Sequence, residues 1–384
     1  METIAEIYKD HQLDKQLRQA KSFNLTNFNA FEVLQQGQIN VLESYRSVLP
    51  DQYLGIEVEV ERVRDISLFL SKVHSSYIRV TEDGSLRENG REFILQPHKA
   101  IHTPYYLTAL YNTLPAGRSF SGRTSTHIHF NVLDMTLEQI KSVIYIYLAV
   151  EGLLYKYIGR DRDKSIFCVP LYQTKLLMNI DSIFNNGKIG SMSWMKYTGL
   201  NILPVFKQGT LEFRHLYGCE EPSQILEWLE ILLCIFKYAK ENDPKLVSEE
   251  IVALNTTSQY FNFLEKVFMQ YAKLLVCKRF EKTMEKGVAY LKACVFPNSF
   301  FVSVRGNREK ASLGYEKLCK VLQLSGSKRV IDIPIPKFKN NSSKVAYAAY
   351  GTLLNQVAFN NPMAQINPMA QIDIATPTED GDAE

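Results

Sequence analysis

The chain has 384 residues, enough for one large domain or two packed lobes, and its 44 basic and 41 acidic side chains give a net charge of +3. Hydrophobic residues make up 46% and charged residues 22%, a globular composition that excludes a disordered or fibrous protein. The balanced charge predicts no nucleic-acid partner and no anionic membrane partner, so any bound phosphate would need a local site.

The first part of the chain predicts a helical extension followed by hairpins. Residues 1–50 are charged and rich in Gln, and we expect a helical N-terminal extension there. From about 53 to 132 apolar and polar residues alternate, broken by the turn pairs Asp83-Gly84 and Asn89-Gly90, which is typical of β-hairpins. The expected strands are 55–63, 77–81, a short 85–87, 91–96 and 126–132.

Helix signals dominate from residue 136 onward. A capping-box pattern at Thr136 and a C-cap at Gly159 predict a helix over 137–158. Strand patterns return at 200–205 and 210–216, and Pro222 opens an apolar helix that we expect to reach Lys240. Beyond 245 the expected elements are helices near 257–285, 309–323 and 343–357 and a β-branched segment at 300–304. The acidic end, where the hexapeptide NPMAQI occurs twice in succession, is predicted to be disordered.

These elements predict an α+β fold. We expect an antiparallel β-sheet with a polar, metal-binding concave face, helices packed on the other side, and a helical C-terminal region. The expected organisation is an N-terminal extension (1–50), a core that contains the sheet (51–242), a mainly helical C-terminal region (243–358) and a disordered acidic tail (359–384). The tail is a candidate for binding a protein partner.

The N-terminal residues and the cysteines bear on the cellular compartment. Residues 1–19 are charged throughout and lack the apolar segment of a secretory signal. The most apolar stretch, residues 143–150, is far shorter than the roughly 20 residues that span a bilayer. The six cysteines form no CxxC motif, which favours reduced thiols over bound zinc. We therefore expect a cytoplasmic protein, with association with a virion as the alternative.

The first strand places several carboxylates on one face. Glu57, Glu59 and Glu61 alternate with apolar residues, and same-face neighbours along a strand lie roughly 7 Å apart. At an effective dielectric constant of about 20, each adjacent pair would repel by roughly 2 kcal/mol. A solvated face whose acids pair with cross-strand Lys or Arg would also explain this pattern. We interpret Glu61 as a supporting or surface acid.

Two later strands repeat this division into an apolar and a polar face. His127 and His129 share a face in 126–132, and Glu212 and Arg214 share one in 210–216. Each pattern alone is ordinary. Together, and with Glu92 after a hairpin turn, they predict a face of carboxylates and imidazoles that a hard divalent cation would neutralise. A ligand set rich in Glu favours Mg²⁺ or Mn²⁺ over zinc.

An ordered set of motifs covers residues 53–240. In chain order they are Glu57-x-Glu59, Asp83-Gly-Ser-Leu86 with Gly90-x-Glu92, His127-x-His129, Lys196-Tyr197 with Leu200-Asn201, and Gly209-Thr-Leu-Glu212-x-Arg214 before a long helix. This set resembles the amidoligase family of carboxylate–amine ligases, which is similar in fold to glutamine synthetase and glutamate–cysteine ligase. The residues before and after this range are not covered by the resemblance.

The resemblance implies an ATP-dependent ligase that phosphorylates a carboxylate to an acyl phosphate, which an amine then attacks to form an amide. It implies ATP and two or more Mg²⁺ as cofactors, with Mn²⁺ as an alternative. The implied metal ligands are Glu57, Glu59, Glu92, His127 and Glu212. The implied catalytic residues are Arg214, His129 and Asn201, with Arg214 stabilising the transferred phosphoryl group. The implied nucleotide-binding residues are Arg160, Arg162, Lys196 and Arg214.

Several alternatives stay open at this point. The carboxylate and amine substrates are small molecules, peptides or protein side chains, and the family resemblance allows a homo-oligomer. A catalytically silent ligase-like fold, reused for binding or assembly, is the main alternative function, and a metal-dependent phosphoesterase is another. Glu151 lies on the core-facing stripe of the helix 137–158, where we expect it to pair with a buried arginine or amide or else to support the site.

Overall fold

The computed structural model describes residues 3–7, 45–64, 66–67, 78–159, 161–174 and 196–295, all within one compact unit, Met1–Pro336. Several expectations lie outside the described residues: most of the N-terminal extension, the segments 300–304, 309–323 and 343–357, the tail 359–384, and Arg160. Near the N-terminus the structure describes the short helix α1 (Ile4–Ile7), and the preceding Thr3 pairs with Thr136.

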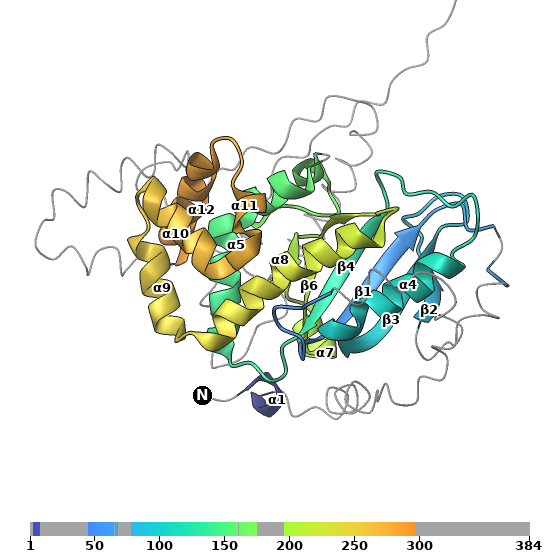
Figure 1. Cartoon of the computed structure of the whole chain (residues 1–384), viewed down its shortest axis with the longest axis horizontal. Coiled ribbons are helices and arrows are strands. Elements are labelled where there is room, and N and C mark those ends of the chain that lie inside the picture. Colours follow the sequence, from blue (N-terminus) through green and yellow to red (C-terminus); the bar gives the residue numbers. More distant parts are fainter. Residues whose placement is uncertain are drawn as a thin grey trace, which may run out of the picture. The chain divides into compact units, whose positions relative to one another are not determined.

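The centre of the fold is a six-stranded sheet with the strand order β2-β3-β1-β4-β6-β5. All of its described strand pairs are antiparallel. The strands are β1 (Tyr53–Val60), β2 (Ile78–Glu82), β3 (Arg91–Lys99), β4 (Ser125–Asn131), β5 (Leu200–Asn201) and β6 (Thr210–Tyr217). Helices accompany the sheet (Figure 1), so the predicted α+β class and antiparallel sheet are confirmed.

The helices follow the caps and prolines of the sequence. They are α4 (Thr103–Thr113), α5 (Leu137–Ile158), α7 (Pro204–Gln208), α8 (Pro222–Glu241), α9 (Pro244–Ala253), α10 (Thr257–Phe268), α11 (Ala272–Leu275) and α12 (Phe280–Val295). At α5 the predicted capping box is present, because Thr136 and Gln139 bond each other's backbone N–H. The predicted bounds of α5 are confirmed.

Three expected elements are wrong in part. Residues 85–87 form no strand, because they lie in the turns between β2 and β3, where Glu88 and Asn89 have positive φ. The expected strand 200–205 ends at Asn201, since Pro204 begins α7. The expected helix 257–285 is broken after Phe268, where Met269 has a φ of 50° and no longer continues the helix.

Three helices, α4, α7 and α9, were not predicted as separate elements. Both α4 and α9 have a proline in the first turn, and Asp243 caps α9 by accepting hydrogen bonds from the backbone N–H groups of Lys245 and Leu246. The cap at Asp243 followed by Pro244 was a readable signal for α9. No helix in the described part of the chain is long and apolar enough to cross a bilayer.

One face of the sheet is apolar and is covered by helices. Ile56 of β1 is fully buried, and the ring of Phe130 on β4 stacks on Phe236 of α8 with centroids 4.5 Å apart. Phe213 on β6 meets Tyr147 of α5 edge-on at 5.9 Å. Figure 1 shows α4 and α8 lying across this side of the strands. The opposite face is therefore left to the polar side chains of β1, β3, β4 and β6.

The helices that follow residue 243 share the same core. Met284 and Leu291 of α12 are fully buried and belong to one hydrophobic cluster with the sheet and α5. Gly287 of α12 allows a close crossing, because a Cβ there would lie 2.6 Å from the carbonyl oxygen of Leu148 and 2.7 Å from that of Ala149. Both obstacles are main-chain atoms of α5, which cannot rotate away.

Replacing Gly287 with alanine should therefore destabilise the protein by about 1–3 kcal/mol, because the added methyl group overpacks the α5–α12 contact. Urea unfolding would measure this change. Gly122→Ala is the matched control, since a Cβ at Gly122 meets nothing within 4 Å. An unfolding midpoint for Gly287→Ala equal to that of the control would contradict the close crossing.

Candidate metal centre

Strand register gathers the predicted ligands on the polar face. Directly opposed residues of neighbouring strands have Cβ atoms about 4.5–5.5 Å apart, so their side chains can meet without a loop between them. The opposed pairs on this face are Glu57–His127, Glu59–Glu92 and His129–Glu212. Since β1 lies between β3 and β4, these pairs form one continuous group across four strands.

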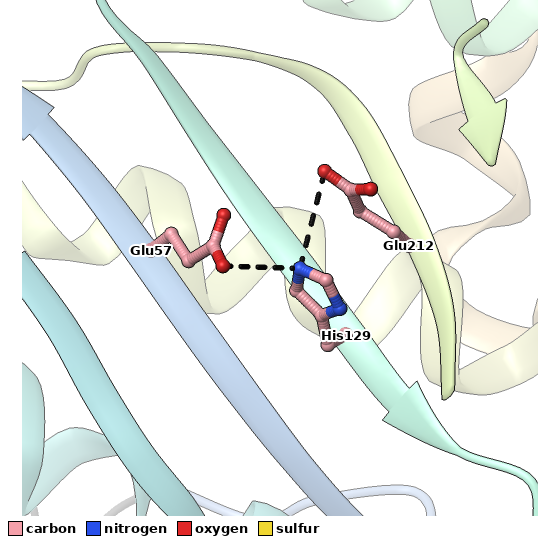
Figure 2. Close-up of side chains that lie close together, drawn as sticks. All are labelled: Glu57, His129 and Glu212. Carbon is pink, nitrogen blue, oxygen red and sulfur yellow. Dashed lines mark ion pairs between the residues drawn. The ribbon is translucent and has the colours of Figure 1, made fainter. Parts of the chain in front are cut away.

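His129 lies between two carboxylates (Figure 2). Its Nε2 atom is 3.3 Å from Glu57 Oε1 and 3.9 Å from Glu212 Oε1. This nitrogen is buried and has no hydrogen-bond partner among the described residues, whereas Nδ1 is bonded to Thr210 Oγ1 at 3.1 Å. A buried imidazole nitrogen that is aimed between two carboxylates and lacks a hydrogen bond suits a cation at that position.

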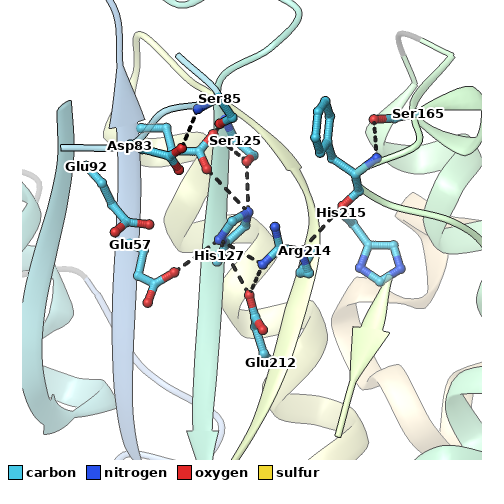
Figure 3. A network of polar contacts seen from close by, with 12 residues as sticks. Glu57, Asp83, Ser85, Glu92, Ser125, His127, Ser165, Glu212, Arg214 and His215 are labelled. Atoms are coloured by element: carbon cyan, nitrogen blue, oxygen red, sulfur yellow. Dashed lines mark hydrogen bonds and ion pairs between the residues drawn. The ribbon is translucent and has the colours of Figure 1, made fainter. Parts of the chain in front are cut away.

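His127 occupies the centre of the polar network (Figure 3). Its Nδ1 lies 3.1 Å from Glu57 Oε2 and 3.5 Å from Glu212 Oε1, and its Nε2 lies 2.8 Å from Ser125 Oγ. The Ser125 hydroxyl donates its one proton to Glu59 Oε2 at 2.7 Å. Nε2 therefore donates to Ser125, and Nδ1 faces the carboxylates of Glu57 and Glu212.

Three overlapping groups of side chains can each hold a metal ion, with their ligand atoms within 4.8 Å of one another. The groups are Glu57–His129–Glu212, Glu57–Glu92–His127 and Glu59–Asp83–Glu92. Glu57 belongs to the first two and Glu92 to the last two, so neighbouring ions would share a bridging carboxylate. Oxygen ligands with an occasional imidazole suit Mg²⁺ or Mn²⁺.

The pKa values reflect an excess of negative charge. Burial raises the pKa of Glu92 to about 8, and the nearby Glu57 carboxylate adds to that rise. Burial lowers the pKa of His129, but Glu57 and Glu212 outweigh it and raise the pKa to about 9. Burial also works to raise the pKa of Glu57, yet His129 and His127 hold that pKa well below its usual range. Protons on Glu92 and His129 thus balance charge that a divalent cation would otherwise neutralise.

Arg214 lies beside the ligands. Its Nη1 is paired with Glu212 and lies 3.5 Å from His127 Nδ1, and its Nε donates to the carbonyl oxygen of Phe167 at 3.3 Å. The guanidinium carbon is 5.8 Å from the ring centre of Tyr197, and Lys196 Nζ lies over the same ring at 4.6 Å. Two cations therefore flank Tyr197 at the edge of the carboxylate group.

No protein-family model matches this chain, and a search of curated proteins finds no similar sequence. The amidoligase resemblance therefore rests on the motif residues alone. All of the metal ligands that it implies lie in the three groups described above. His129, which it implies as catalytic, lies among them as a ligand candidate.

The other predicted site residues have different surroundings. Asn201 is buried, and its amide nitrogen donates to Glu212 Oε2 at 2.6 Å, so it positions a ligand candidate. Arg162 is only 6% exposed. Its Nε and Nη2 donate to the main-chain oxygens of His215 and Arg214, both at 2.9 Å. Two of its donors are thus bonded to the backbone, and the expectation that Arg162 binds the nucleotide stays a prediction.

Residue patterns missed part of the polar network. Asp83 was interpreted only as a turn residue, and it does accept the Ser85 N–H at 2.7 Å, but it also belongs to the third metal-ligand group. Ser125 carries no motif signal, although its position two residues before His127 places it on the same strand face. Glu61 is buried and accepts the N–H of Arg87 at 2.9 Å, so it supports the β2–β3 turn and is no surface acid.

Glu151 is buried away from this group. It accepts hydrogen bonds from the Tyr147 hydroxyl at 2.8 Å and from the backbone N–H groups of Leu171 at 2.6 Å and Tyr172 at 3.1 Å. Its described hydrogen-bond partners are thus a hydroxyl and main-chain amides, with no arginine. Burial raises the pKa of Glu151 to about 7, and the three hydrogen bonds limit that rise.

Replacing Ser125 with alanine should weaken Mn²⁺ or Mg²⁺ binding by about 10- to 100-fold, because Glu59 and the His127 ring lose the hydroxyl that orients them. Titration calorimetry with the metal alone would measure the loss. Ser248→Ala is the control, since the one described hydrogen bond of the Ser248 hydroxyl is to the Pro244 carbonyl oxygen of α9. Unchanged metal affinity in Ser125→Ala would contradict this role.

Glu151 should make stability fall as pH rises. The unfolded carboxyl loses its proton near pH 4.5, whereas the folded one keeps it until about pH 7. Between these values the folded state binds more protons, so the free energy of unfolding falls by at most about 1.4 kcal/mol per pH unit. Chemical denaturation at pH 5, 6 and 7 should show a flatter profile for Glu151→Gln than for wild type. Glu138→Gln on the same helix, whose side chain is 45% exposed, should keep the wild-type slope.

Proposed function

We propose that this protein is an ATP- and Mg²⁺-dependent ligase that joins a carboxylate to an amine, as its motifs imply. The supporting observation is the convergence of all the implied metal ligands, with Arg214 beside them, on one sheet face. The ligands come from four strands whose motifs are scattered over more than 150 residues of the sequence. Such convergence is unexpected for solvated acids that serve only solubility.

The reaction requires charge neutralisation and positioning more than it requires acid–base groups. A carboxylate oxygen attacks the γ-phosphorus of ATP and ADP leaves; the amine nitrogen then attacks the acyl carbon, phosphate leaves, and the amine releases a proton. Mg²⁺, when bound, supplies charge neutralisation of the phosphates. The carboxylates of β1, β3 and β6 would hold the ions in fixed places.

Arg214 has the position that this chemistry needs from a fixed cation. It contacts Glu212 and approaches His127 but is not itself a ligand, and it is largely buried. Burial works to lower the pKa of Arg214, but the Glu212 carboxylate outweighs it and raises the pKa, so the guanidinium stays charged. A preorganised cation beside the metal ligands would stabilise the equatorial oxygens of the transferred phosphoryl group. Lys196, over the Tyr197 ring, would extend this positive edge.

The first experiment is calorimetric titration of ATP with and without Mg²⁺. Wild type should bind ATP in the micromolar range only when Mg²⁺ is present, and Glu57→Gln and Glu212→Gln should each abolish that binding, because each removes a carboxylate from the groups that hold the ions. Glu88→Gln is the control, since Glu88 is an exposed acid that pairs with Arg62 away from the group.

The next measurement is phosphate release with panels of carboxylates and amines, including free amino acids, peptides and protein side chains. Release that requires both substrates supports the ligase. Phosphate release that needs no amine acceptor indicates a metal-dependent phosphoesterase. Absence of ATP binding in every condition contradicts the ligase and favours a ligase-like fold reused for binding or assembly.

A further inference from the structure

The segment 161–174, which follows α5, runs beside β6 at the point where the sheet ends. Strand β5 pairs with Glu212 and Phe213, and the carbonyl oxygen of Gly199, just before β5, accepts the Arg214 N–H at 2.9 Å. Directly beyond, the Arg162 guanidinium donates to the carbonyl oxygens of Arg214 and His215, both at 2.9 Å. The planar fork of an arginine can thus bind two adjacent main-chain acceptors at once. These two hydrogen bonds hold β6 at Arg214, whose guanidinium lies beside the ligand candidates.

The same segment also contacts the Arg214 side chain. The Phe167 carbonyl oxygen accepts the Nε–H of Arg214 at 3.3 Å, while Nη1 faces Glu212. A register shift between β4 and β6 lies at the same place, opposite His127. At such a bulge the strand ladder alone does not fix the side-chain direction. The Phe167 carbonyl oxygen and the Glu212 carboxylate thus each hold one side of the Arg214 guanidinium.

The segment is itself firmly held from α5 and from the residues before β5. Both carboxylate oxygens of Glu151 accept its N–H groups at Leu171 and Tyr172. The Tyr155 hydroxyl donates to the Cys168 carbonyl oxygen at 2.9 Å. Val169 forms two main-chain hydrogen bonds, to the oxygen of Tyr197 at 2.7 Å and from the N–H of Gly199 at 2.9 Å. A buried carboxylate that binds two backbone amides fixes a loop as a helix cap does.

The C-terminal helix α12 contacts the far end of the segment. The Tyr290 hydroxyl lies 2.9 Å from the carbonyl oxygen of Thr174 and 3.3 Å from that of Leu171. Tyr290 is buried and belongs to the hydrophobic cluster that α12 shares with α5. A continuous set of contacts therefore leads from α12 through the segment to Arg214.

We infer that residues 161–174 form a positioning loop that fixes the direction of Arg214, with Arg162 and Tyr290 as positioning residues. Arg162 has the wrong exposure for a phosphate ligand, since it is 6% exposed and its two described hydrogen bonds are to main-chain oxygens. The catalytic consequence of the loop rests on the proposed ligase function, but its effect on Arg214 does not. Helix α12, which lies outside the motif resemblance, thereby acquires a role at the site.

The test compares Arg162→Met with Lys164→Met. Lys164 is an exposed neighbour on the same loop that pairs with Asp161, so its loss controls for removal of a positive charge. Nitrogen-15 NMR of the arginine Nε–H groups, assigned with Arg214→Lys, measures the hydrogen exchange of Arg214 directly. Arg162→Met should speed that exchange by about 10-fold or more, while Lys164→Met leaves it unchanged. Mn²⁺ affinity should change by less than about 3-fold in both variants, since neither residue is a ligand.

The kinetic test uses the ligase assay where activity is found. Arg162→Met should lower kcat by about 100-fold with little change in the KM for ATP, because misplaced catalytic groups lose rate more than binding. A loss of ATP affinity with unchanged Arg214 exchange would overturn the inference and make Arg162 a phosphate ligand. Absence of ligase activity in wild type would refute the proposed function alone, since the exchange measurement still tests the loop.

A second variant tests the inference in case Arg162→Met does not fold. Tyr290→Phe removes one hydroxyl from the buried face of α12 and should speed Arg214 exchange by a smaller factor than Arg162→Met. Tyr238→Phe is its control, because the Tyr238 hydroxyl bonds Glu250 elsewhere in the helical part of the fold. Equal Arg214 hydrogen exchange in Tyr290→Phe and Tyr238→Phe would mean that α12 does not help to position Arg214, which contradicts that part of the inference.

Discussion

Because side chains alternate along a strand, the register of β1 against β3 and β4 decides everything on the polar face. A slip of β1 by one residue would carry Glu57 and Glu59 into the apolar core and bring Ile56 and Val58 to the metal centre. The packed aromatic rings under β4 and β6 oppose such a slip, since they require apolar partners on the helix-covered face. The packing of the apolar core therefore fixes the strand register that places the ligand candidates on the polar face.

Four of the ligand candidates share one arrangement: a neighbouring residue bonds one polar atom of the side chain, and another atom of that side chain remains for the centre. The pairs of held atom and neighbour are Glu59 Oε2 with Ser125, Glu212 Oε2 with Asn201, Glu92 Oε2 with Thr81, and His129 Nδ1 with Thr210. Hydroxyl and amide groups provide this support without adding charge. The net charge of the centre is thus set by its carboxylates, imidazoles and Arg214, and the supporting residues determine geometry alone.

The sequence was sufficient to predict which strand residues share the polar face, because a period of two is a property of any strand. Caps predicted both ends of α5 for an equally local reason. Loop side chains were different: Arg162 follows Asp161, which has a φ of 53°, and this turn directs the guanidinium toward β6. The helix break at Met269, with a φ of 50°, gave no compositional signal. Both depend on tertiary packing, which residue patterns do not contain.

The close crossing of α5 and α12 sets a limit on how this chain can be divided. The motifs end with α8, so a shortened chain stopping near residue 242 would contain every ligand candidate. It would nevertheless uncover the α5 surface around Gly152, where Thr283 of α12 now packs, and leave the Thr174 carbonyl oxygen without Tyr290. We therefore expect the smallest part of this chain able to fold to extend beyond the ligand candidates and to include α12.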